Sequence, residues 1–328
     1  MLSSSRLALT AIALALTFAP AHAAEGFSFA DSPGDHLDIL FDGKVVARYM
    51  YAHDTSTKEK ADLTYKPYLH VFDADGTAPI TKGPGGQFTH HRGIFPGWMK
   101  ISHNGKTYDR WHMKGGDIVH QKFAEQHATK DSAAFTSLTH WVAEPGQAMI
   151  EEARTMSIRK LPAPGRLLIT LETKLSAPLG DIKLDGDPEH AGVQFRPANE
   201  IDAKKTTYIF PKADADPTKD RDYPWVGETF SLNGKDHSVV IFNDPKNPKE
   251  TRFSAYRDYG RFGAFPVAEI KKGESLTLKY GFLIAEGALP SVEYVQQQYD
   301  AFAGLKASPV PQTTVKNAAV KAAPKKKN

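Results

Sequence analysis

Alternation of apolar and polar side chains dominates this sequence and predicts β-strands. Residues 166–175 carry leucine or isoleucine at nearly every second position, with threonine, glutamate or lysine between them. Residues 275–284 repeat the alternation with leucine, tyrosine, phenylalanine and isoleucine. A period of two is typical of strands that bury one face. Both segments are therefore expected to be strands of a large sheet.

Two further segments read as β-hairpins. Residues 36–49 alternate on both sides of Asp42-Gly43, and residues 229–242 do so on both sides of Asn233-Gly234. These dipeptides favour the tight turns that join antiparallel strands. Because the two hairpins lie far apart in the chain, antiparallel pairing is expected throughout it.

One segment near the C-terminus has the spacing of a helix. Val292, Val295, Tyr299 and Phe302 recur at intervals of three or four, after a proline and a serine that favour a helix start. Many short strands with a single late helix indicate an all-β fold. The sequence therefore predicts a large antiparallel β-sandwich, a supersandwich, with one C-terminal helix.

The two ends of the chain differ from the body. Residues 1–23 combine an early arginine, an apolar run and small residues at 21 and 23, which predicts a signal peptide cleaved after Ala23 and a periplasmic or secreted protein. Residues 24–305 are expected to form one sandwich domain, because no linker-like stretch interrupts them. Residues 306–328, rich in lysine, alanine and proline, are expected to be a disordered tail.

Composition excludes several classes of function. Without Arg6 and the six lysines from Lys306 onward, 34 basic residues face 38 acidic ones, so the net charge of the body is −4. A nucleic-acid-binding body normally carries a basic patch, and no nucleic-acid partner is expected. No later stretch is apolar enough for stable membrane insertion. Cysteine is absent, so disulfides are excluded, and no phosphate loop, dinucleotide fingerprint or nucleophile elbow indicates a cofactor or serine hydrolase.

The run FTHHRGIFPGW, residues 88–98, concentrates candidate chemistry behind a glycine-rich loop. In an extended segment, His90 and Arg92 would point to one side and His91 to the other. Adjacent histidines on a strand do not easily share a metal ion, so proton transfer by imidazole and anion binding by guanidinium are preferred, and no metal site is expected. The alternative is a hydrogen-bonded pair that locks a loop. Trp98 is a candidate for stacking on a sugar.

A second cluster, YDRWHM, contains Asp109, Arg110, Trp111 and His112. An aspartate beside a histidine fixes its tautomer and raises its basicity. Trp111 offers a rigid apolar face on which a sugar ring can stack. The alternative is a salt bridge between Asp109 and Arg110 at the end of a strand, with Trp111 in the core.

A third cluster lies in PEHAGVQFRP, where His190, Gln194 and Arg196 fall in phase on one strand face, with Glu189 as the nearest carboxylate. We expect these polar side chains to line a groove, and the alternative is an ordinary edge strand with a solvated face. A fourth cluster, YRDYGRF, offers Arg257 and Tyr259 beside a glycine. Its tyrosine would donate to an oxyanion or act as an acid, whereas ordinary aromatic packing is the alternative.

These clusters together resemble a bacterial family of unknown function known as PmoA-like, or "methane oxygenase". The motifs that carry the resemblance are THHRGIFPGW, DRWHM, HAGVQFRP, NDPKNP with YRDYGRFGAFP, and LKYGFLIAEG. The resemblance runs from about Phe27 to Ala303 and implies a galactose-mutarotase-like sandwich in an exported protein. It also implies that the site includes His90, His91 and Arg92.

The preferred hypothesis is a carbohydrate-active enzyme that hydrolyses, eliminates or epimerises a sugar by histidine and arginine acid–base chemistry. The expected catalytic residues are His90, His91, Arg92, Asp109, His112, His190 and Tyr259. The expected substrate-binding residues are Trp98, Arg110, Trp111, Gln194, Arg196 and Arg257. The alternatives are a non-catalytic sugar-binding protein and a metal-dependent oxygenase. The enzyme hypothesis requires that His91, His112, His190 and Arg196, distant in sequence, lie in one hollow.

Overall fold

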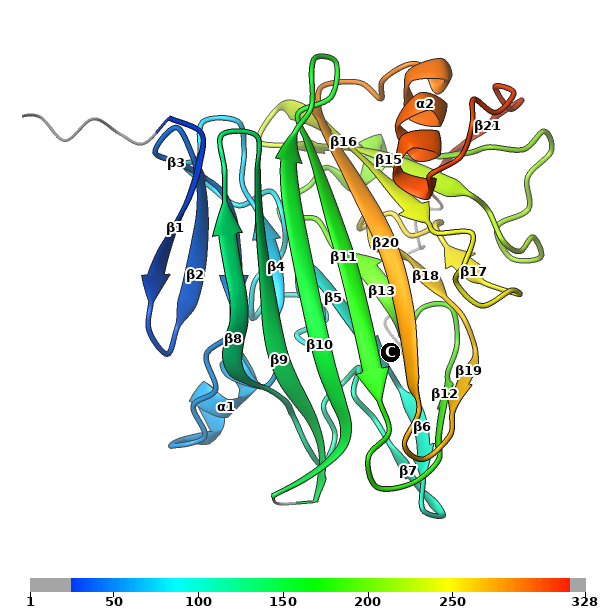
Figure 1. Cartoon of the computed structure of the whole chain (residues 1–328). Coiled ribbons are helices and arrows are strands. Elements are labelled where there is room, and N and C mark those ends of the chain that lie inside the picture. Colours follow the sequence, from blue (N-terminus) through cyan, green and yellow to red (C-terminus); the bar gives the residue numbers. More distant parts are fainter. Residues whose placement is uncertain (1–24, 145, 319–328) are drawn as a thin grey trace, which may run out of the picture.

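The computed structural model describes residues 25–144 and 146–318, which form two large antiparallel sheets packed face to face (Figure 1). The predicted β-sandwich is confirmed. The eight-stranded sheet contains, in spatial order, β1 (Phe27–Ser32), β2 (His36–Phe41), β3 (Lys44–Met50), β4 (Tyr68–Val71), β5 (Ile94–Trp98), β13 (Ala191–Phe195), β18 (Phe262–Phe265) and β17 (Arg252–Ser254).

The second sheet has nine strands, and a small four-stranded sheet extends one end of the sandwich. The nine-stranded sheet contains β21 (Thr314–Asn317), β14 (Thr207–Phe210), β15 (Trp225–Leu232), β16 (Lys235–Asn243), β20 (Ser275–Glu286), β11 (Leu167–Ser176), β10 (Gln147–Lys160), β9 (Ser132–Glu144) and β8 (Ile118–Ala128). The small sheet contains β19 (Ala268–Ile270), β12 (Ile182–Asp185), β6 (Lys100–His103) and β7 (Lys106–Tyr108).

Both predicted hairpins form at the predicted turns. Asp42 and Gly43 join β2 to β3, and Asn233 and Gly234 join β15 to β16. All four residues have positive φ angles, between 49° and 78°. Two consecutive positive φ angles give the type of turn whose twist matches that of antiparallel strands.

The two large sheets share one apolar core, which contains side chains of strands from both. The Tyr49 hydroxyl of β3 donates to Ser137 Oγ of β9 over 3.0 Å. The rings of Trp98 in β5 and Trp141 in β9 lie 6.0 Å apart. The inner face of each sheet is therefore packed against the other, and the outer face of the eight-stranded sheet remains available for loops.

The described residues contain two α-helices rather than the one predicted. The predicted helix is α2 (Val292–Ala303), whose apolar side packs on the outer face of the nine-stranded sheet. The additional helix, α1 (Lys58–Thr64), has no buried side chain, and the hydroxyl of its N-cap residue Thr57 accepts from the Lys60 N–H. It shows no apolar period, so the sequence pattern missed it. No helix among the described residues has the length and apolar character that a membrane crossing requires.

The predicted disordered tail is partly wrong. Residues 306–318 are described, and β21 within them pairs with β14 at the edge of the nine-stranded sheet. An edge strand presents unpaired backbone N–H and C=O groups, and the threonine and valine of β21 favour the extended conformation. The predicted signal peptide and the last ten residues of the tail lie outside the described residues.

A fully buried ion pair lies in the interior of the sandwich. Arg154 of β10 donates to the Glu152 carboxylate of the same strand over 2.8 Å, and both side chains are 0% exposed. Arg154 also donates to the backbone oxygen of Pro67 over 3.0 Å. Further donors to the carboxylate are Thr139, Trp141 and Thr173. Every charged oxygen is therefore satisfied, as burial requires.

Substituting Arg154→Met is expected to destabilise the protein by about 3–5 kcal/mol, because it leaves Glu152 as an unpaired buried charge. Urea unfolding followed by circular dichroism measures the loss. Glu151→Ala, at the exposed neighbouring position, is the matched control and is expected to change stability by less than about 0.5 kcal/mol. A loss below about 1 kcal/mol for Arg154→Met, as for an exposed pair, would contradict this account.

Glu228 of β15 is also a buried carboxyl group, but its surroundings differ from those of Glu152. It is 0% exposed, and neither oxygen has a hydrogen bond of normal geometry. Burial raises the pKa of Glu228 well above its usual value, against the attraction of Arg196. The folded protein therefore keeps this group protonated in a range of pH where the unfolded chain ionises it.

Folding stability is accordingly expected to fall as the pH rises from about 4.5, by up to about 1.4 kcal/mol per pH unit from this group. Glu228→Gln removes the titration, so the stability of the wild type relative to this variant should fall between pH 5 and pH 7. Urea unfolding at pH 5, 6 and 7 measures the difference, with Glu172→Gln at an exposed position of β11 as control. A difference that does not vary with pH would show that Glu228 is ionised.

Candidate functional site

Residues 88–91 form a turn, and residues 92 and 93 precede the strand, so the extended segment predicted from Phe88 does not form there. Phe88 has a φ of 53°, and the backbone N–H of His91 donates to the Phe88 oxygen over 2.8 Å. The strand β5 begins only at Ile94. The alternation predicted for His90, His91 and Arg92 is therefore wrong, because the turn places their side chains instead of a strand pleat.

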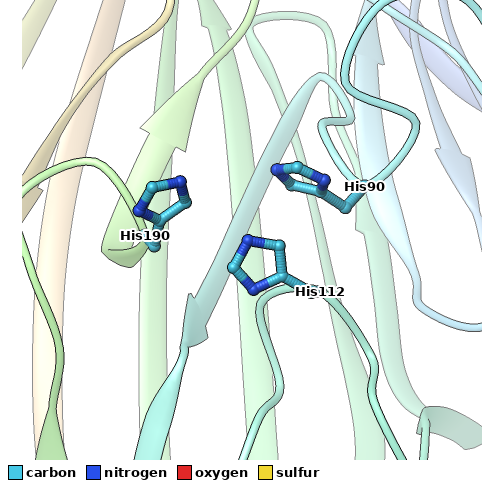
Figure 2. Close-up of side chains that lie close together, drawn as sticks. All are labelled: His90, His112 and His190. Carbon is cyan, nitrogen blue, oxygen red and sulfur yellow. The ribbon is translucent and has the colours of Figure 1, made fainter.

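Three histidines from three separate loops come together over the eight-stranded sheet (Figure 2). His90 precedes β5, His112 follows β7, and His190 precedes β13. The ring centres of His90 and His112 lie 4.4 Å apart, and those of His112 and His190 lie 5.0 Å apart. One nitrogen from each ring lies within 4.8 Å of the other two. We call these three residues the histidine trio.

Two members of the trio sit in turns of the same design. In the first turn, Asp109 Oδ1 accepts from the backbone N–H groups of Trp111 and His112, and Oδ2 contacts His112 Nδ1 over 2.8 Å. These hydrogen bonds outweigh burial and lower the pKa of Asp109. The carboxylate thus fixes both the backbone of the turn and the direction of the ring, as predicted for this pair.

The second turn repeats this arrangement 78 positions later in the sequence. Asp187 Oδ1 accepts from the backbone N–H groups of Glu189 and His190 and contacts His190 Nδ1 over 2.9 Å. In both turns an aspartate stands three residues before the histidine. A carboxylate only accepts, so in the neutral ring Nδ1 carries the proton and Nε2 has the free lone pair. Two such lone pairs therefore belong to the trio.

The electrostatic environment keeps the remaining imidazoles neutral. Burial, assisted by His112 and Lys66, lowers the pKa of His90 to about 2. Burial and the nearby Arg261 also lower the pKa of His91 far below its usual value. His91 is 2% exposed, and neither of its ring nitrogens has a hydrogen-bond partner. It lies beneath the trio, with its ring centre 4.4 Å from that of His90.

The floor of the site is aromatic and buried. Trp111 is 0% exposed, and its ring lies 5.1 Å from Phe95 and 6.3 Å from His190. Lys66 donates to the Trp111 backbone oxygen over 2.8 Å. Trp98 points into the core between the sheets and donates to the backbone oxygen of Pro266. Neither tryptophan offers the open face that was predicted to stack on a sugar.

The predicted arginines hold loops rather than face the hollow. Arg92 donates to the backbone oxygens of Thr89, His91 and Asp62. Arg110 donates to those of Asp109, Lys114, Gly115 and Val142. Arg196 donates to those of Pro197 and Tyr259 and to the Asn199 side chain. All three guanidinium groups are at most 1% exposed. Most of their N–H groups donate to the chain, and the Nε atoms of Arg92 and Arg196 that lack a partner are buried, so the geometry does not support direct contact with a substrate.

Gln194 also supports the site from beneath. This side chain of β13 is fully buried and donates to the Arg92 backbone oxygen over 2.7 Å. The strand therefore fixes the turn that carries His90. Of the stripe predicted on this strand, only Gln194 lies within β13, because His190 belongs to the preceding turn and Arg196 follows the strand. The prediction of an open polar groove along β13 is therefore wrong.

Partly exposed side chains form the rim of the site. Arg257 and Glu189 make a two-point ion pair, with Nε to Oε2 at 2.9 Å, and the Tyr256 hydroxyl donates to Glu189 Oε1. Burial opposes ionisation, but Arg257 lowers the pKa of Glu189, which is therefore a poor proton donor. Tyr259 lies 4.8 Å from Phe88, ring to ring. At 38% exposure, Phe88 is the one exposed phenylalanine or tryptophan in the described chain.

A cavity of about 640 Å³ lies on the same outer face over β3 and β4, and no member of the trio lines it. Its titratable groups already have partners. Arg48 is paired with Asp38 at 2.6 Å, and His70 contacts Thr81 Oγ1 at 2.9 Å. Lys66 lines this cavity and also holds the Trp111 backbone, so the two regions are neighbours. Unpartnered nitrogens gather at the trio, and we therefore place the chemistry there.

The structure thus brings His90, His91, His112, His190 and Tyr259 close together. Arg196, which the enzyme hypothesis also required in the hollow, is instead buried and donates to loop backbone oxygens, so the requirement is met only in part. Three contributors were missed: Asp187, Phe88 and Lys66. The repeated spacing of aspartate and histidine at 109–112 and 187–190 was a signal for Asp187. No sequence signal distinguished Phe88 as exposed, because most phenylalanines are buried. The expectation of no metal site assumed that the histidines stay apart, whereas the loops collect three of them.

Comparison with solved structures gives distant similarities. A putative aldose 1-epimerase from Klebsiella pneumoniae is 9% identical, with a TM-score of 0.44 over 88% of this chain and 96% of that chain. A galactose mutarotase-like protein from Lactobacillus casei is 10% identical, with a TM-score of 0.32 over 79% of this chain and 100% of that chain.

A heparan sulfate lyase from Pedobacter heparinus is 8% identical, with a TM-score of 0.40 over 79% of this chain, which spans only 36% of the lyase. No curated protein matches the sequence. A family model does match, over residues 36–300, and its description is a family of unknown function, DUF6807. Because that match covers most of the chain, the protein belongs to the DUF6807 family.

Proposed function

We propose that this protein is an exported carbohydrate-active enzyme whose active centre is the histidine trio. The observation that carries the proposal is the convergence of three imidazoles from three loops, two of them oriented by carboxylates. The side chains of His112 and His190 are 20% and 31% exposed, so a ligand can reach them. A histidine with a purely structural role is usually buried, so this partial exposure favours a functional role.

The geometry suits proton transfer to and from a sugar. Each of His112 and His190 presents a lone pair on Nε2 while an aspartate holds its Nδ1 proton. The carboxylate also stabilises the imidazolium that forms when Nε2 accepts a proton. Two such groups 5.0 Å apart, centre to centre, provide a base and, after protonation, an acid. Hydrolysis, elimination and epimerisation all require this combination.

The rim suits a sugar ring. Phe88 and Tyr259 form an aromatic pair beside the trio, and Phe88 is exposed although it is strongly apolar. Aromatic faces bind the apolar faces of sugars and leave the hydroxyl groups to polar neighbours. Arg257 and Glu189, each about one-fifth exposed, supply such polar groups. The local chemistry, and not the distant likeness to epimerases and lyases, supports the choice of substrate class.

The sequence motifs also resemble the PmoA-like family called "methane oxygenase", and this resemblance suggests a second candidate function, a metal-dependent oxygenase. The observation that favours it is the trio itself, since three imidazole nitrogens within 4.8 Å can hold a metal ion. We prefer the carbohydrate-active enzyme because the exposed aromatic rim has no role in the second candidate. Export to the periplasm remains part of this proposal and depends on the predicted signal peptide.

Incubation with a panel of neutral and uronic oligosaccharides, read by mass spectrometry, is expected to give a change of mass or of reducing ends for at least one substrate. His112→Ala is then expected to lower kcat by about 10²–10⁴-fold, because it removes a positioned acid–base group. His127→Ala, an exposed histidine on β8, is the control and should leave turnover unchanged. Retention of unmodified sugar would instead identify a binding protein, and unaltered turnover in His112→Ala would refute the assignment of the site.

Phe88→Ala is expected to raise KM for the same substrate by about 5- to 100-fold, with a smaller effect on kcat. This range assumes that a sugar face on the ring contributes as much as a stacked nucleobase does, about 1–3 kcal/mol. Steady-state kinetics separate the two parameters. Leu63→Ala, which removes an exposed apolar side chain on α1, is the matched control. Equal KM values for Phe88→Ala and the wild type would exclude Phe88 from the sugar site.

A further inference from the structure

The nitrogen atoms of the trio have the arrangement of ligands around a metal ion. His90, His112 and His190 each place one ring nitrogen within 4.8 Å of the other two (Figure 2). In Figure 2 the three rings surround a common point and come from three different segments of the ribbon. Among the described residues, this is the one group of three or more histidine or acidic side chains with such spacing.

We propose that the histidine trio binds one divalent transition-metal ion of the zinc, cobalt or copper type, through one nitrogen from each ring. This inference rests on the proposed site but changes the role of its histidines, because a ring nitrogen that binds an ion cannot also accept a proton. A bound ion would polarise an oxygen of the sugar or lower the pKa of a water molecule, as three-histidine centres do.

The first support is the direction of the free lone pairs. Asp109 and Asp187 occupy Nδ1 of His112 and His190, so Nε2 is the nitrogen that remains for a ligand. Histidines that bind metals commonly donate their other ring N–H to a carboxylate, which fixes the tautomer and makes the ring a better ligand. The repetition of this design in two unrelated turns is hard to explain by the stability of the turns alone, since the aspartates already cap the backbone without the rings.

The second support is the unpartnered state of His90. Its Nε2 is buried and has no hydrogen-bond partner. An orphaned buried nitrogen of this kind is costly, and a protein normally satisfies it. A metal ion shared with His112 and His190 would satisfy it. The adjacent His91 points beneath the trio instead, towards Tyr259 and Trp111, which explains how neighbouring histidines avoid competing for one ion.

The spacing requires a small adjustment. Tetrahedral zinc with bonds of about 2.0–2.1 Å brings ligand nitrogens to within roughly 3.3 Å of each other. The present limit of 4.8 Å exceeds this by about 1.5 Å. All three histidines lie on loops, whose side chains rotate more readily than those of strands. Binding is therefore expected to draw the three loops together.

The donor set selects the kind of metal. Three neutral imidazoles favour zinc, copper and cobalt, whereas calcium and magnesium prefer oxygen ligands. The nearby carboxylates of Asp109 and Asp187 offset part of the positive charge of the ion, against the opposing charges of Lys66 and Arg92. With His112 and His190 partly exposed, a further coordination position is open to water or substrate.

The test uses untagged protein, freed of metal by a chelator and titrated with Zn²⁺ by calorimetry and with Co²⁺ by visible absorption. One equivalent of each is expected to bind, and the Co²⁺ spectrum is expected to show four- or five-coordination by nitrogen. Ca²⁺ and Mg²⁺ are expected not to compete. Asp109→Asn and Asp187→Asn are expected to weaken binding by about 10–100-fold, and removal of a trio histidine by alanine is expected to weaken it more.

His127→Ala and His36→Ala, which alter histidines outside the trio, are the controls and should bind as the wild type does. Circular dichroism of each variant establishes that it is folded. Absence of stoichiometric binding, or binding that survives all three of His90→Ala, His112→Ala and His190→Ala, would overturn the proposal. Metal binding is measured without sugar, so failure to bind a metal is distinct from failure to turn over a sugar. Turnover of sugar in excess chelator would support the carbohydrate proposal and contradict a role of the metal ion in it.

Discussion

Two aspartate–imidazole hydrogen bonds organise the candidate site. Asp109 and Asp187 each accept from two backbone N–H groups and from the histidine three residues later. A single carboxylate thus determines the shape of the turn, the tautomer of the ring and the direction of its free nitrogen. Since neither His112 nor His190 lies on a strand, nothing else in the backbone would fix their rings with this accuracy.

Buried arginines satisfy backbone oxygens in the long loops that cover the β-sandwich. Loops that cover a sheet bury backbone oxygens that no neighbouring strand can satisfy. A guanidinium group has five N–H donors in a fixed plane, so Arg92, Arg110 and Arg196 can each satisfy several of these oxygens. The positive charges of Arg92, Arg196 and Arg261 also lower the pKa of His90 or His91 and so favour neutral imidazoles. The same side chains therefore stabilise the loops and tune the site.

The sandwich provides a rigid base on which these loops vary. The eight-stranded sheet packs its inner face on the shared core and carries the loops on its outer face. Sites of this kind are built on loops because a scaffold can change its loops without losing its core. The fold class itself hosts many activities, so distant likeness in the strands of other proteins says little about the reaction. The arrangement of nitrogens, carboxylates and exposed rings is the informative part.

The sequence by itself determined six of the strands (β2, β3, β11, β15, β16 and β20), the two hairpin turns and α2, because alternation, Asp-Gly or Asn-Gly dipeptides and helical spacing are local signals. It also identified Asp109 with His112, three residues apart. Tertiary structure decided the rest. The helix α1 and the strand β21 depend on a cap and on a sheet edge, and the exposure of Phe88, the burial of Trp111 and the meeting of His90 with His190 depend on loops packed together across the sheet. Such contacts join residues distant in sequence, and no local pattern encodes them.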